Sequence, residues 1–351
     1  MLFNVQRFPL GWRFFILENK KGENKMKHVR SKMLAFILAL TLGLLAGCGA
    51  ESNEANGSVN EQPAKGQEAT QESLFPVTFK DDSGKEITIE EEPESIVSMQ
   101  PSTTEVAYAL GLGNKMVGVS DYCNYPGETA DVEKVGGQDM NVELILSLTP
   151  DLIFVTDYHY QNHEPILKQY EEAGITVVVI GSESSFADVY ETMELIGKAT
   201  GKTIEAEALI ADMKERLAAV EEKAKEVTDK KKVWVEVSPA PDIFTTGQGT
   251  FMHEMLEAIQ AENAAGDQEG WVKLTEEEIV KLNPDVIITT YGYYVDNPKE
   301  GVLERAGWAE VPAIKSGEVH DVDSDTVTRP GPRLIEGVEH LAKLIYPEIF
   351  E

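Results

Sequence analysis

Basic residues are scarce in this sequence. Its 351 residues include 31 lysines and arginines against 61 aspartates and glutamates, which gives a formal net charge of −30. Nucleic-acid binding requires clustered lysine and arginine side chains that neutralise phosphates, so this balance argues against a nucleic-acid partner. An acidic surface keeps a protein soluble and can steer it toward a basic partner.

Cysteines are also few, and the common catalytic motifs are absent. Cys48 and Cys123 cannot form a disulfide framework, and their spacing is not that of a zinc site. The sequence has no C-x-x-C, no G-x-x-x-x-G-K-[ST] and no G-x-S-x-G motif. In "HEMLE", residues 253–257, a zinc protease would need a second histidine in place of Glu257. We therefore expect no enzyme, and a zinc-dependent surface hydrolase built around His253 is a remote alternative.

Long apolar runs are rare as well, and the most conspicuous one lies near the start of the chain. Met33 to Ala46 is a largely apolar run of 14 residues, short for a permanent membrane helix, and basic residues precede it. We predict that residues 26–47 are a secretory signal peptide. "LAGC", which ends at Cys48, resembles the lipobox of bacterial lipoproteins and implies cleavage before Cys48 and lipid attachment to its sulfur.

The segments on either side of this signal have different predicted roles. Residues 1–25 do not fit a signal peptide, so we interpret them as an over-annotated extension ahead of a true start at Met26. Residues 48–75 contain few large apolar side chains and cannot bury enough surface to offset the entropy of ordering. We interpret them as a lipid-anchored flexible tether. The rest of the chain would then sit at the outer face of the cytoplasmic membrane.

The rest of the chain alternates strand and helix patterns in two regions. Residues 76–184 begin with a β-hairpin pattern around Asp82-Ser83-Gly84 and continue with short apolar runs separated by helical periodicity. Residues 229–351 repeat that alternation. Between them, residues 185–228 have helical spacing with a mild break at Thr200-Gly201-Lys202. The predicted fold class is α/β: two Rossmann-like lobes with covered parallel sheets, joined by a single long rigid α-helix, with a ligand cleft between the lobes.

The first helix of the N-terminal lobe is predicted to begin with a capping box. Ser102 and Glu105 stand three positions apart at the start of "STTEVAYALGLG". In a capping box these two side chains would satisfy each other's backbone N–H groups.

One segment occurs twice in the sequence. "NVELILSLTPDLIFVT" at residues 141–156 and "TEEEIVKLNPDVIITT" at residues 275–290 are each typical of a helix followed by a strand. Glu143 and Glu277 stand at the same place in the two copies, seven residues before a Pro-Asp pair. The repeat indicates that the two lobes are related units, and chance agreement between two helix–strand patterns is the alternative.

Taken together, these features resemble the substrate-binding lipoproteins of ABC importers, in the class whose two lobes are joined by one rigid helix. That class serves ferric siderophores, haem and cobalamin, and the closest likeness is to the cobalamin-binding proteins. The resemblance covers residues about 95 to 346. It rests on six stretches in order: "PSTTEVAYALG", "GVSDYCNYP", "MNVELILSLTPDLI", "IFTTG", "GW" ahead of "EEEIVKLNPDVI", and "SDTVTRPGPR".

The resemblance gives the repeated glutamates a role. It implies that Glu143 and Glu277 are docking residues, one on each lobe, that pair with arginines of the membrane permease through bidentate hydrogen bonds. The alternative is an exposed glutamate in the first turn of a helix, where it suits the helix dipole. Glu276 and Glu278 flank Glu277 and could take its place.

The resemblance also implies five ligand-binding residues, namely Tyr122, Phe244, Trp271, Asp325 and Arg329. Aromatic side chains cover a large flat ring at low entropic cost, which suits the apolar face of a corrin. Asp325 and Arg329 could hydrogen-bond the amides at the edge of such a ring or pair with each other. Phe244 could equally belong to the core of its lobe.

The sequence departs from the cobalamin-binding proteins ahead of Met140. The stretch "GGQDMN" lacks the tryptophan that they carry just before "MN". The segment "DYHYQNH" at residues 157–163 could compensate through Tyr158, Tyr160, His159 or His163, and its histidines could also coordinate a metal centre. Cys123, beside Tyr122, either contacts the ligand or packs as a small buried side chain.

We therefore expect an extracytoplasmic binding lipoprotein that delivers cobalamin or a related corrinoid to a permease and, through it, to the ATPase. A ferric siderophore would call for more cationic side chains, and haem would call for an axial ligand such as His159 or Met140. A surface adhesion or scaffold protein is a further alternative. We expect a monomer with no resident cofactor or metal.

Overall fold

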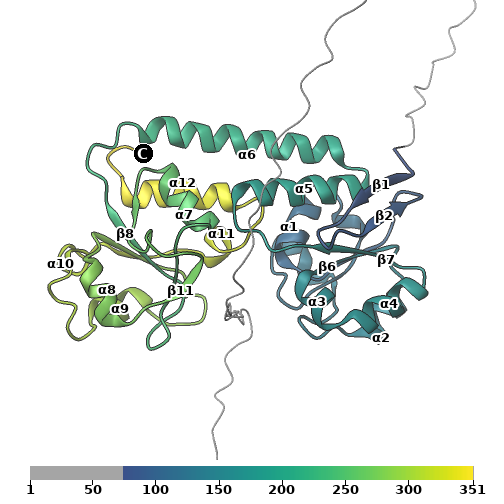
Figure 1. The fold of residues 1–351 in the computed structure, drawn as a ribbon, viewed down its shortest axis with the longest axis horizontal. Helices are drawn as coiled ribbons and strands as arrows, with labels where there is room; N and C mark the ends of the chain where they lie inside the picture. The colour runs from purple at the N-terminus through teal and green to yellow at the C-terminus, as the bar shows by residue number, and fades with distance from the viewer. Residues whose placement is uncertain (1–73, 351) are drawn as a thin grey trace, which may run out of the picture. The chain divides into compact units, whose positions relative to one another are not determined.

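The computed structural model describes residues 74–350. The predictions for the extension, the signal peptide, lipidated Cys48 and nearly all of the tether lie outside the described residues. Within the described range the chain forms two α/β lobes, so the predicted fold class is confirmed (Figure 1). No helix among these residues is both long and apolar enough to cross a membrane.

The N-terminal lobe is built on a parallel sheet with the order β5-β4-β3-β6-β7, preceded by the predicted antiparallel hairpin of β1 and β2. Its strands are β1 (Val77–Lys80), β2 (Glu86–Ile89), β3 (Ile96–Ser98), β4 (Met116–Val119), β5 (Glu133–Lys134), β6 (Leu152–Thr156) and β7 (Thr176–Ile180). Its helices are α1 (Pro101–Ala109), α2 (Val142–Leu148), α3 (Asp157–Asn162), α4 (Glu164–Glu172) and α5 (Phe186–Thr200), with short 3-10 helices at η1 (Gly113–Lys115) and η2 (Gly127–Asp131).

The C-terminal lobe has a parallel sheet with the order β10-β8-β12-β13 and an antiparallel ribbon of β9 and β11. Its strands are β8 (Lys232–Glu236), β9 (Phe244–Thr246), β10 (Glu262–Asn263), β11 (Trp271–Lys273), β12 (Val286–Thr289) and β13 (Val319–Asp321). The remaining helices are α6 (Thr203–Ala224), α7 (Phe251–Ala258), α8 (Glu276–Leu282), α9 (Pro298–Leu303), α10 (Pro312–Ser316), α11 (Ser324–Val327) and α12 (Leu334–Ile345).

The two lobes contain three apolar cores. One belongs to the N-terminal lobe alone and is centred on Val97, Ile145 and Ile153. A second belongs to the C-terminal lobe alone and contains Trp234 and Trp308. The third is continuous between the lobes and includes Phe154, Val178, Met193, Met213, Leu256 and Leu341. Because separating the lobes would expose this shared core to water, apolar burial opposes large lobe movements.

The helix predicted over residues 185–228 is in fact two helices. The chain reverses between α5 and α6 at Gly201, whose φ of 71° lies in the left-handed region that glycine adopts without strain. The two helices pack closely there, because a Cβ on Gly197 would lie 2.7 Å from the Cβ of Ala206. The prediction of one uninterrupted helix was therefore wrong at this turn. Figure 1 shows that α6 alone passes over both lobes, packing on α5, α7 and α12.

The predicted capping box at the start of α1 is also wrong. The helix begins one residue earlier, at Pro101, because a proline at the first helical position has the required φ and no N–H to satisfy. Ser102 is thus inside the helix, and its buried hydroxyl has no hydrogen-bond partner among the described residues. The carboxylate of Glu105 is likewise not used as a cap.

The sequence repeat is a structural repeat. Each copy is a seven-residue helix, α2 or α8, that ends at a left-handed residue, Thr149 (φ 46°) or Asn283 (φ 55°). The following aspartate fastens the start of the neighbouring strand: Asp151 accepts a hydrogen bond from the Ser95 N–H at 2.9 Å, and Asp285 accepts one from the Lys232 N–H at 2.9 Å. The shared aspartate is therefore explained by backbone hydrogen bonding, because these N–H groups need acceptors.

Glu183 is a partly buried carboxyl group beside β7. It accepts a hydrogen bond from the Thr192 hydroxyl at 3.1 Å. Burial raises its pKa from an ordinary value of 4.5 to about 7, and the nearby carboxylates of Asp82 and Asp157 act in the same direction. Between these two values the unfolded chain releases the proton while the folded chain keeps it, so stability falls as the pH rises through this range.

Glu183→Gln should remove this loss, because glutamine keeps an acceptor for Thr192 and has no proton to release. We expect the variant to be more stable than the wild type at pH 8, by at most about 3 kcal/mol, and to differ little at pH 4.5. Thermal unfolding at the two pH values measures the difference. The exposed control Glu207→Gln should show no such pH dependence, and an equal effect of Glu183→Gln at both pH values would contradict the assignment.

Candidate functional site

The two repeated glutamates occupy the same structural position in the two lobes. Glu143 lies in the first turn of α2 and Glu277 in the first turn of α8, and both side chains are exposed. Neither makes a hydrogen bond or an ion pair with another residue in the range 74–350. Each therefore presents to solvent a carboxylate that no other described residue engages.

The structure also distinguishes Glu277 from its neighbours. Glu278 accepts hydrogen bonds from the Thr275 N–H at 2.8 Å and the Thr275 hydroxyl at 2.9 Å, and Thr275 caps the helix in return. Its carboxylate is thus committed to the capping box. Glu276 is half-buried. Of the three, Glu277 is the exposed carboxylate with no such commitment.

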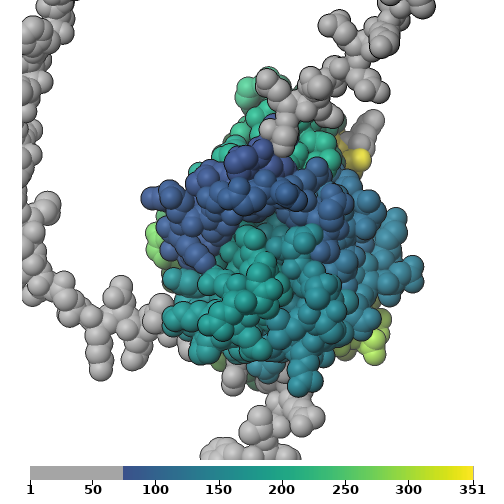
Figure 2. Space-filling view, turned by 90° about the vertical axis from the view of Figure 1, so that its right-hand side faces the viewer, coloured from purple at the N-terminus to yellow at the C-terminus, as the bar shows by residue number. Residues whose placement is uncertain are grey.

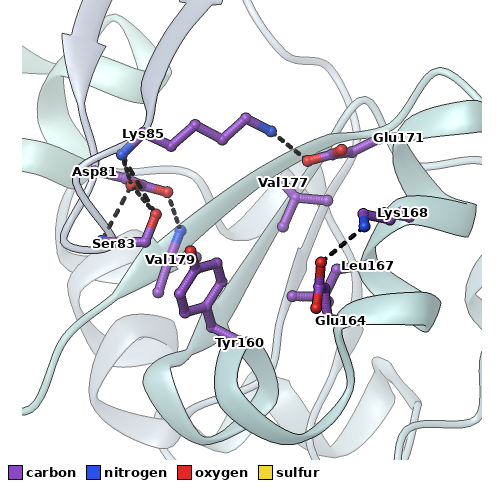
Figure 3. A pocket seen from close by; sticks show the side chains of 10 residues that line it. All are labelled: Asp81, Ser83, Lys85, Tyr160, Glu164, Leu167, Lys168, Glu171, Val177 and Val179. Atoms are coloured by element: carbon purple, nitrogen blue, oxygen red, sulfur yellow. Dashed lines mark hydrogen bonds and ion pairs between the residues drawn. The ribbon is translucent and has the colours of Figure 1, made fainter.

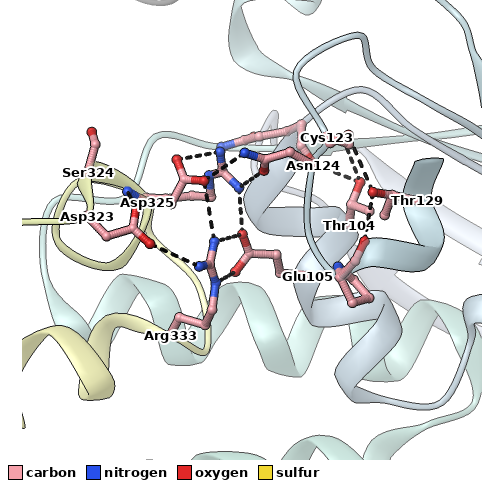
Figure 4. A network of polar contacts seen from close by, with 12 residues as sticks. Thr104, Glu105, Cys123, Asn124, Thr129, Asp323, Ser324, Asp325 and Arg333 are labelled. Carbon is pink, nitrogen blue, oxygen red and sulfur yellow. Dashed lines mark hydrogen bonds and ion pairs between the residues drawn. The ribbon is translucent and has the colours of Figure 1, made fainter. Parts of the chain in front are cut away.

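A buried ion cluster connects the two lobes where α1 meets the start of α12. Glu105 on α1 is only 3% exposed. Arg333 donates to its carboxylate twice, from Nε at 2.9 Å and from Nη2 at 2.7 Å, and Arg329 donates from Nη1 at 2.7 Å. Burial alone would lower the pKa of Arg333, but its hydrogen bonds to Glu105 raise it above the ordinary value. Figure 4 shows this cluster between the two lobes.

Asp325 and Arg329, both predicted ligand contacts, belong to this cluster. They pair with each other, with Arg329 Nη2 2.7 Å from Asp325 Oδ1. Asn124 of the N-terminal lobe joins them: its Nδ2 donates to Asp325 Oδ2 at 2.9 Å, and its Oδ1 accepts from Arg329 Nη1 at 2.9 Å. The side chain of Asp325 is partly exposed, so it remains accessible to a ligand while Arg329 is mostly covered.

Three members of the cluster were not predicted from the sequence: Glu105, Asn124 and Arg333. Glu105 is the one charged residue in helix α1, and a buried charge needs a partner. This pattern was the sequence signal that could have identified Glu105 as a member of an ion cluster. Arg333 closes the quoted stretch "SDTVTRPGPR", and its guanidinium also lies 4.1 Å from the ring centroid of Tyr125. Nothing in the sequence indicates that these residues meet.

The predicted aromatic contacts lie on both lobes. Tyr122 is 43% exposed and its ring lies against Gly137, where a Cβ would come within 2.6 Å of Tyr122 Cε2. Phe244 and Trp271 are half-buried on the ribbon of β9 and β11. Trp271 pairs with Thr246, two residues from Phe244, so both aromatic side chains leave the same face of the ribbon.

The segment 157–163 is more committed to structure than the sequence suggested. His159 is buried, its Nδ1 lies 2.8 Å from the Thr156 hydroxyl, and its Nε2 lies 3.0 Å from the Gly137 carbonyl oxygen. Burial lowers its pKa. Both ring nitrogens are occupied, so His159 could coordinate a metal only by giving up one of these hydrogen bonds. Met140 is also buried, with the Tyr170 hydroxyl 3.9 Å from its sulfur.

Tyr160 faces a different region, a cavity of about 170 Å³ on the N-terminal lobe (Figure 3). The cavity lies between the β1–β2 hairpin, β7 and the helices α3 and α4. Its lysines are both paired, Lys85 with Glu171 and Lys168 with Glu164. Figure 2 shows this side of the lobe, with the hairpin residues in purple-blue beside the teal surface of later residues of the same lobe. The cavity is too small for a corrin ring or haem.

Cys123 and His253 both have structural surroundings. Cys123 is buried, with its sulfur 3.2 Å from the Thr104 hydroxyl, as expected for a small core residue. Next to His253, the Glu254 carboxylate accepts from the Phe186 N–H at 2.8 Å and so links α7 to the start of α5. His253 contacts Asn263 at 3.2 Å. No cluster that could hold a metal occurs among the described residues.

One protein family and several known proteins match most of this chain. The family model described as periplasmic binding protein matches residues 96–326. The uncharacterized ABC transporter substrate-binding lipoprotein YvrC of Bacillus subtilis (strain 168) is 47% identical over 316 residues, covering 90% of this chain and 96% of that protein. The cobalamin-binding protein of Halobacterium salinarum (strain ATCC 29341 / DSM 671 / R1) is 29% identical, covering 88% of this chain and 83% of that protein.

A solved structure shows the same two-lobe architecture. The periplasmic haem-binding protein RhuT from Roseiflexus sp. RS-1, in apo form, superposes with a TM-score of 0.65 and 25% sequence identity. The match covers 72% of this chain and 98% of that chain. The family and these relatives are binding proteins for transport, not enzymes.

Glu105→Ala should destabilise the protein, because it leaves Arg329 and Arg333 buried with less compensating charge. Breaking a buried ion pair from one side typically costs about 3–5 kcal/mol. The midpoint of unfolding in urea measures the effect. The control Glu164→Ala removes half of an exposed ion pair and should leave the midpoint unchanged, whereas equal midpoints for both variants would show that the cluster does not stabilise the lobe boundary.

Proposed function

Because the chain belongs to the periplasmic binding protein family, we propose that it captures cobalamin or a related corrinoid and delivers it to the permease of an ABC importer. The coarser role is established by the family and the relatives: an extracytoplasmic substrate-binding protein of an ABC transporter, of the B12, siderophore and haem type. Such proteins work with the permease and ATPase components of their transporter. The choice of cargo, the docking residues and the lipid anchor are the parts of the proposal that go beyond this role.

The observation that carries the choice of cargo is the charge balance at the lobe boundary. Both arginines there, Arg329 and Arg333, are already bonded to the carboxylates of Glu105 and Asp325. An anionic ferric chelate, or the propionates of haem, would have to compete with these carboxylates for the guanidinium groups. A corrinoid presents amide groups, which need hydrogen-bond donors and acceptors but no net charge. Asp325, being partly exposed, can supply an acceptor.

The aromatic residues support the same cargo. Tyr122 on one lobe and Phe244 and Trp271 on the other offer flat apolar area for a large ring. His159 and Met140, considered as axial ligands for haem, are buried and engaged in other contacts. Neither observation favours haem over a corrinoid.

For delivery, we assign Glu143 and Glu277 to docking. Each is an exposed carboxylate on the equivalent helix of its lobe, so a permease with one arginine site per half could hold both lobes at once. For retention near the membrane, we assign lipid attachment to Cys48, ahead of the tether.

The cargo assignment predicts saturable binding of cyanocobalamin that weakens at least tenfold in Trp271→Ala. Equilibrium dialysis of the purified protein with cyanocobalamin, haem and a ferric hydroxamate measures it, because each ligand can be quantified by its own absorbance. Binding of haem or the hydroxamate alone would keep the transport role and replace the cargo. Binding of none of the three would contradict the proposal.

The docking assignment predicts that Glu143→Ala/Glu277→Ala abolishes uptake while leaving the Kd for the cargo unchanged. Uptake of labelled cobalamin is measured in cells that depend on this protein. The control Glu207→Ala/Glu215→Ala removes two exposed glutamates from α6 and so makes the same change in net charge. Full uptake with the first double variant would rule out docking through these residues.

A further inference from the structure

An aromatic cluster follows β12 and is not among the predicted ligand contacts. Tyr293 is 73% exposed and Tyr294 is 42% exposed. Their ring centroids lie 4.7 Å apart in an edge-to-face arrangement. Tyr294 in turn lies 6.3 Å from the buried ring of Tyr291, whose hydroxyl donates to Glu236 at 2.6 Å. Two adjacent exposed rings that rest on a buried third ring form an apolar surface, which in soluble proteins commonly marks a binding site.

The backbone that carries these rings is held in place. The Gly292 N–H donates to Asp321 Oδ1 at 3.2 Å, and the Thr289 hydroxyl donates to the same oxygen at 2.7 Å. A Cβ on Gly292 would come within 2.0 Å of Asp321 Oδ2, so the close approach requires glycine. The Tyr294 N–H also bonds the Tyr291 carbonyl at 3.1 Å. The rings are therefore positioned before any ligand arrives, which lowers the entropic cost of binding.

The cluster lies at the carboxyl-end edge of the C-terminal sheet, the edge that also carries Asp325. β12 is an inner strand of its parallel sheet, and Tyr293 follows its carboxyl end, the edge at which open α/β sheets bind ligands. Asp325 follows the carboxyl end of β13, the strand next to β12. Desolvation and, after it, the Asp325 carboxylate raise the pKa of the Tyr293 phenol. Asp325 is hydrogen-bonded to Asn124 of the N-terminal lobe. Tyr293 therefore shares this edge of the sheet with a residue that bridges the two lobes.

We propose that Tyr293 and Tyr294 form an aromatic platform on the C-terminal lobe that stacks against the flat ring of the cargo. This inference rests on the proposed function and specifies which residues select a planar macrocycle. It supplies, from the C-terminal lobe, a ring contact to a chain that lacks a tryptophan ahead of Met140 in the N-terminal lobe. The segment 157–163 is a poorer source of that contact, because His159 is buried and Tyr160 faces the cavity beside the hairpin.

The chemistry of the platform suits stacking better than metal coordination. A tyrosine ligand to iron binds as the phenolate. The negative charge of the Asp325 carboxylate disfavours the phenolate form of Tyr293. A neutral phenol keeps its hydroxyl hydrogen, so it can stack through its ring and donate to an amide carbonyl at the ring edge. A corrinoid offers both a flat ring and peripheral amides.

The test compares Tyr293→Ala/Tyr294→Ala with Tyr293→Phe/Tyr294→Phe in the purified full-length protein. We expect the alanine pair to raise the Kd for cyanocobalamin at least tenfold and the phenylalanine pair to stay within about threefold of the wild type, because phenylalanine keeps the rings. Tyr160→Ala is the matched control, since Tyr160 is a similarly exposed tyrosine on the other lobe, and it should not change the Kd. Thermal unfolding midpoints confirm that the variants are folded.

The outcomes separate this inference from the proposed function. If the wild type binds cyanocobalamin and the alanine pair binds it equally well, the platform is excluded and the cargo assignment stands. If the phenylalanine pair loses as much affinity as the alanine pair, the hydroxyl groups rather than the rings are needed, and stacking is excluded. If the wild type binds neither cyanocobalamin nor haem, both the platform and the cargo assignment fail.

Discussion

The carboxylate of Glu105 is buried at the boundary between the lobes, and the positive charge that balances it comes from the other lobe. A buried charge without a partner is costly, so Arg329 and Arg333 must stay within hydrogen-bond distance of it. The continuous apolar core and the helix α6 impose the same restriction by different means. Together these features limit the lobes to small relative movements, which suits a protein that holds its ligand between two nearly fixed surfaces.

The same cluster determines how much charge the boundary can offer a ligand. Because two arginines face the carboxylates of Glu105 and Asp325, the positive charge is largely used within the protein. What remains accessible is part of Asp325, together with exposed aromatic side chains such as Tyr122. A ligand recognised at this boundary, as we propose, would depend on flat apolar area and on hydrogen bonds, and less on the attraction between opposite charges.

Much of this could be predicted from the sequence, because the lobes, the hairpin and the repeated helix–strand unit depend on local periodicity. The features that could not be predicted depend on contacts between distant residues. To predict the turn at Gly201 one would have to know that α5 and α6 pack against each other. The helical pattern on both sides of Gly201 conceals the reversal of the chain. From the sequence, Glu105 could equally be part of a local capping box. Its actual partner, Arg333, lies 228 positions away in the chain. Tyr293 and Tyr294 drew no attention because only the fold rests their rings on the buried ring of Tyr291.

The reversal of the chain in the repeated unit has a further consequence. In each copy, the left-handed residue and the Pro-Asp after the helix turn the chain back into the sheet, so the amino end of the helix lies at the edge where the strand has its carboxyl end. In Figure 1, α2 and α8 both lie on the side of the lobes away from α6. The carboxylates assigned to docking thus share an edge with the loops assigned to the cargo. A permease seated on Glu143 and Glu277 would cover the opening through which the cargo leaves, so a docked molecule could release its ligand only into the transporter and not back to the outside.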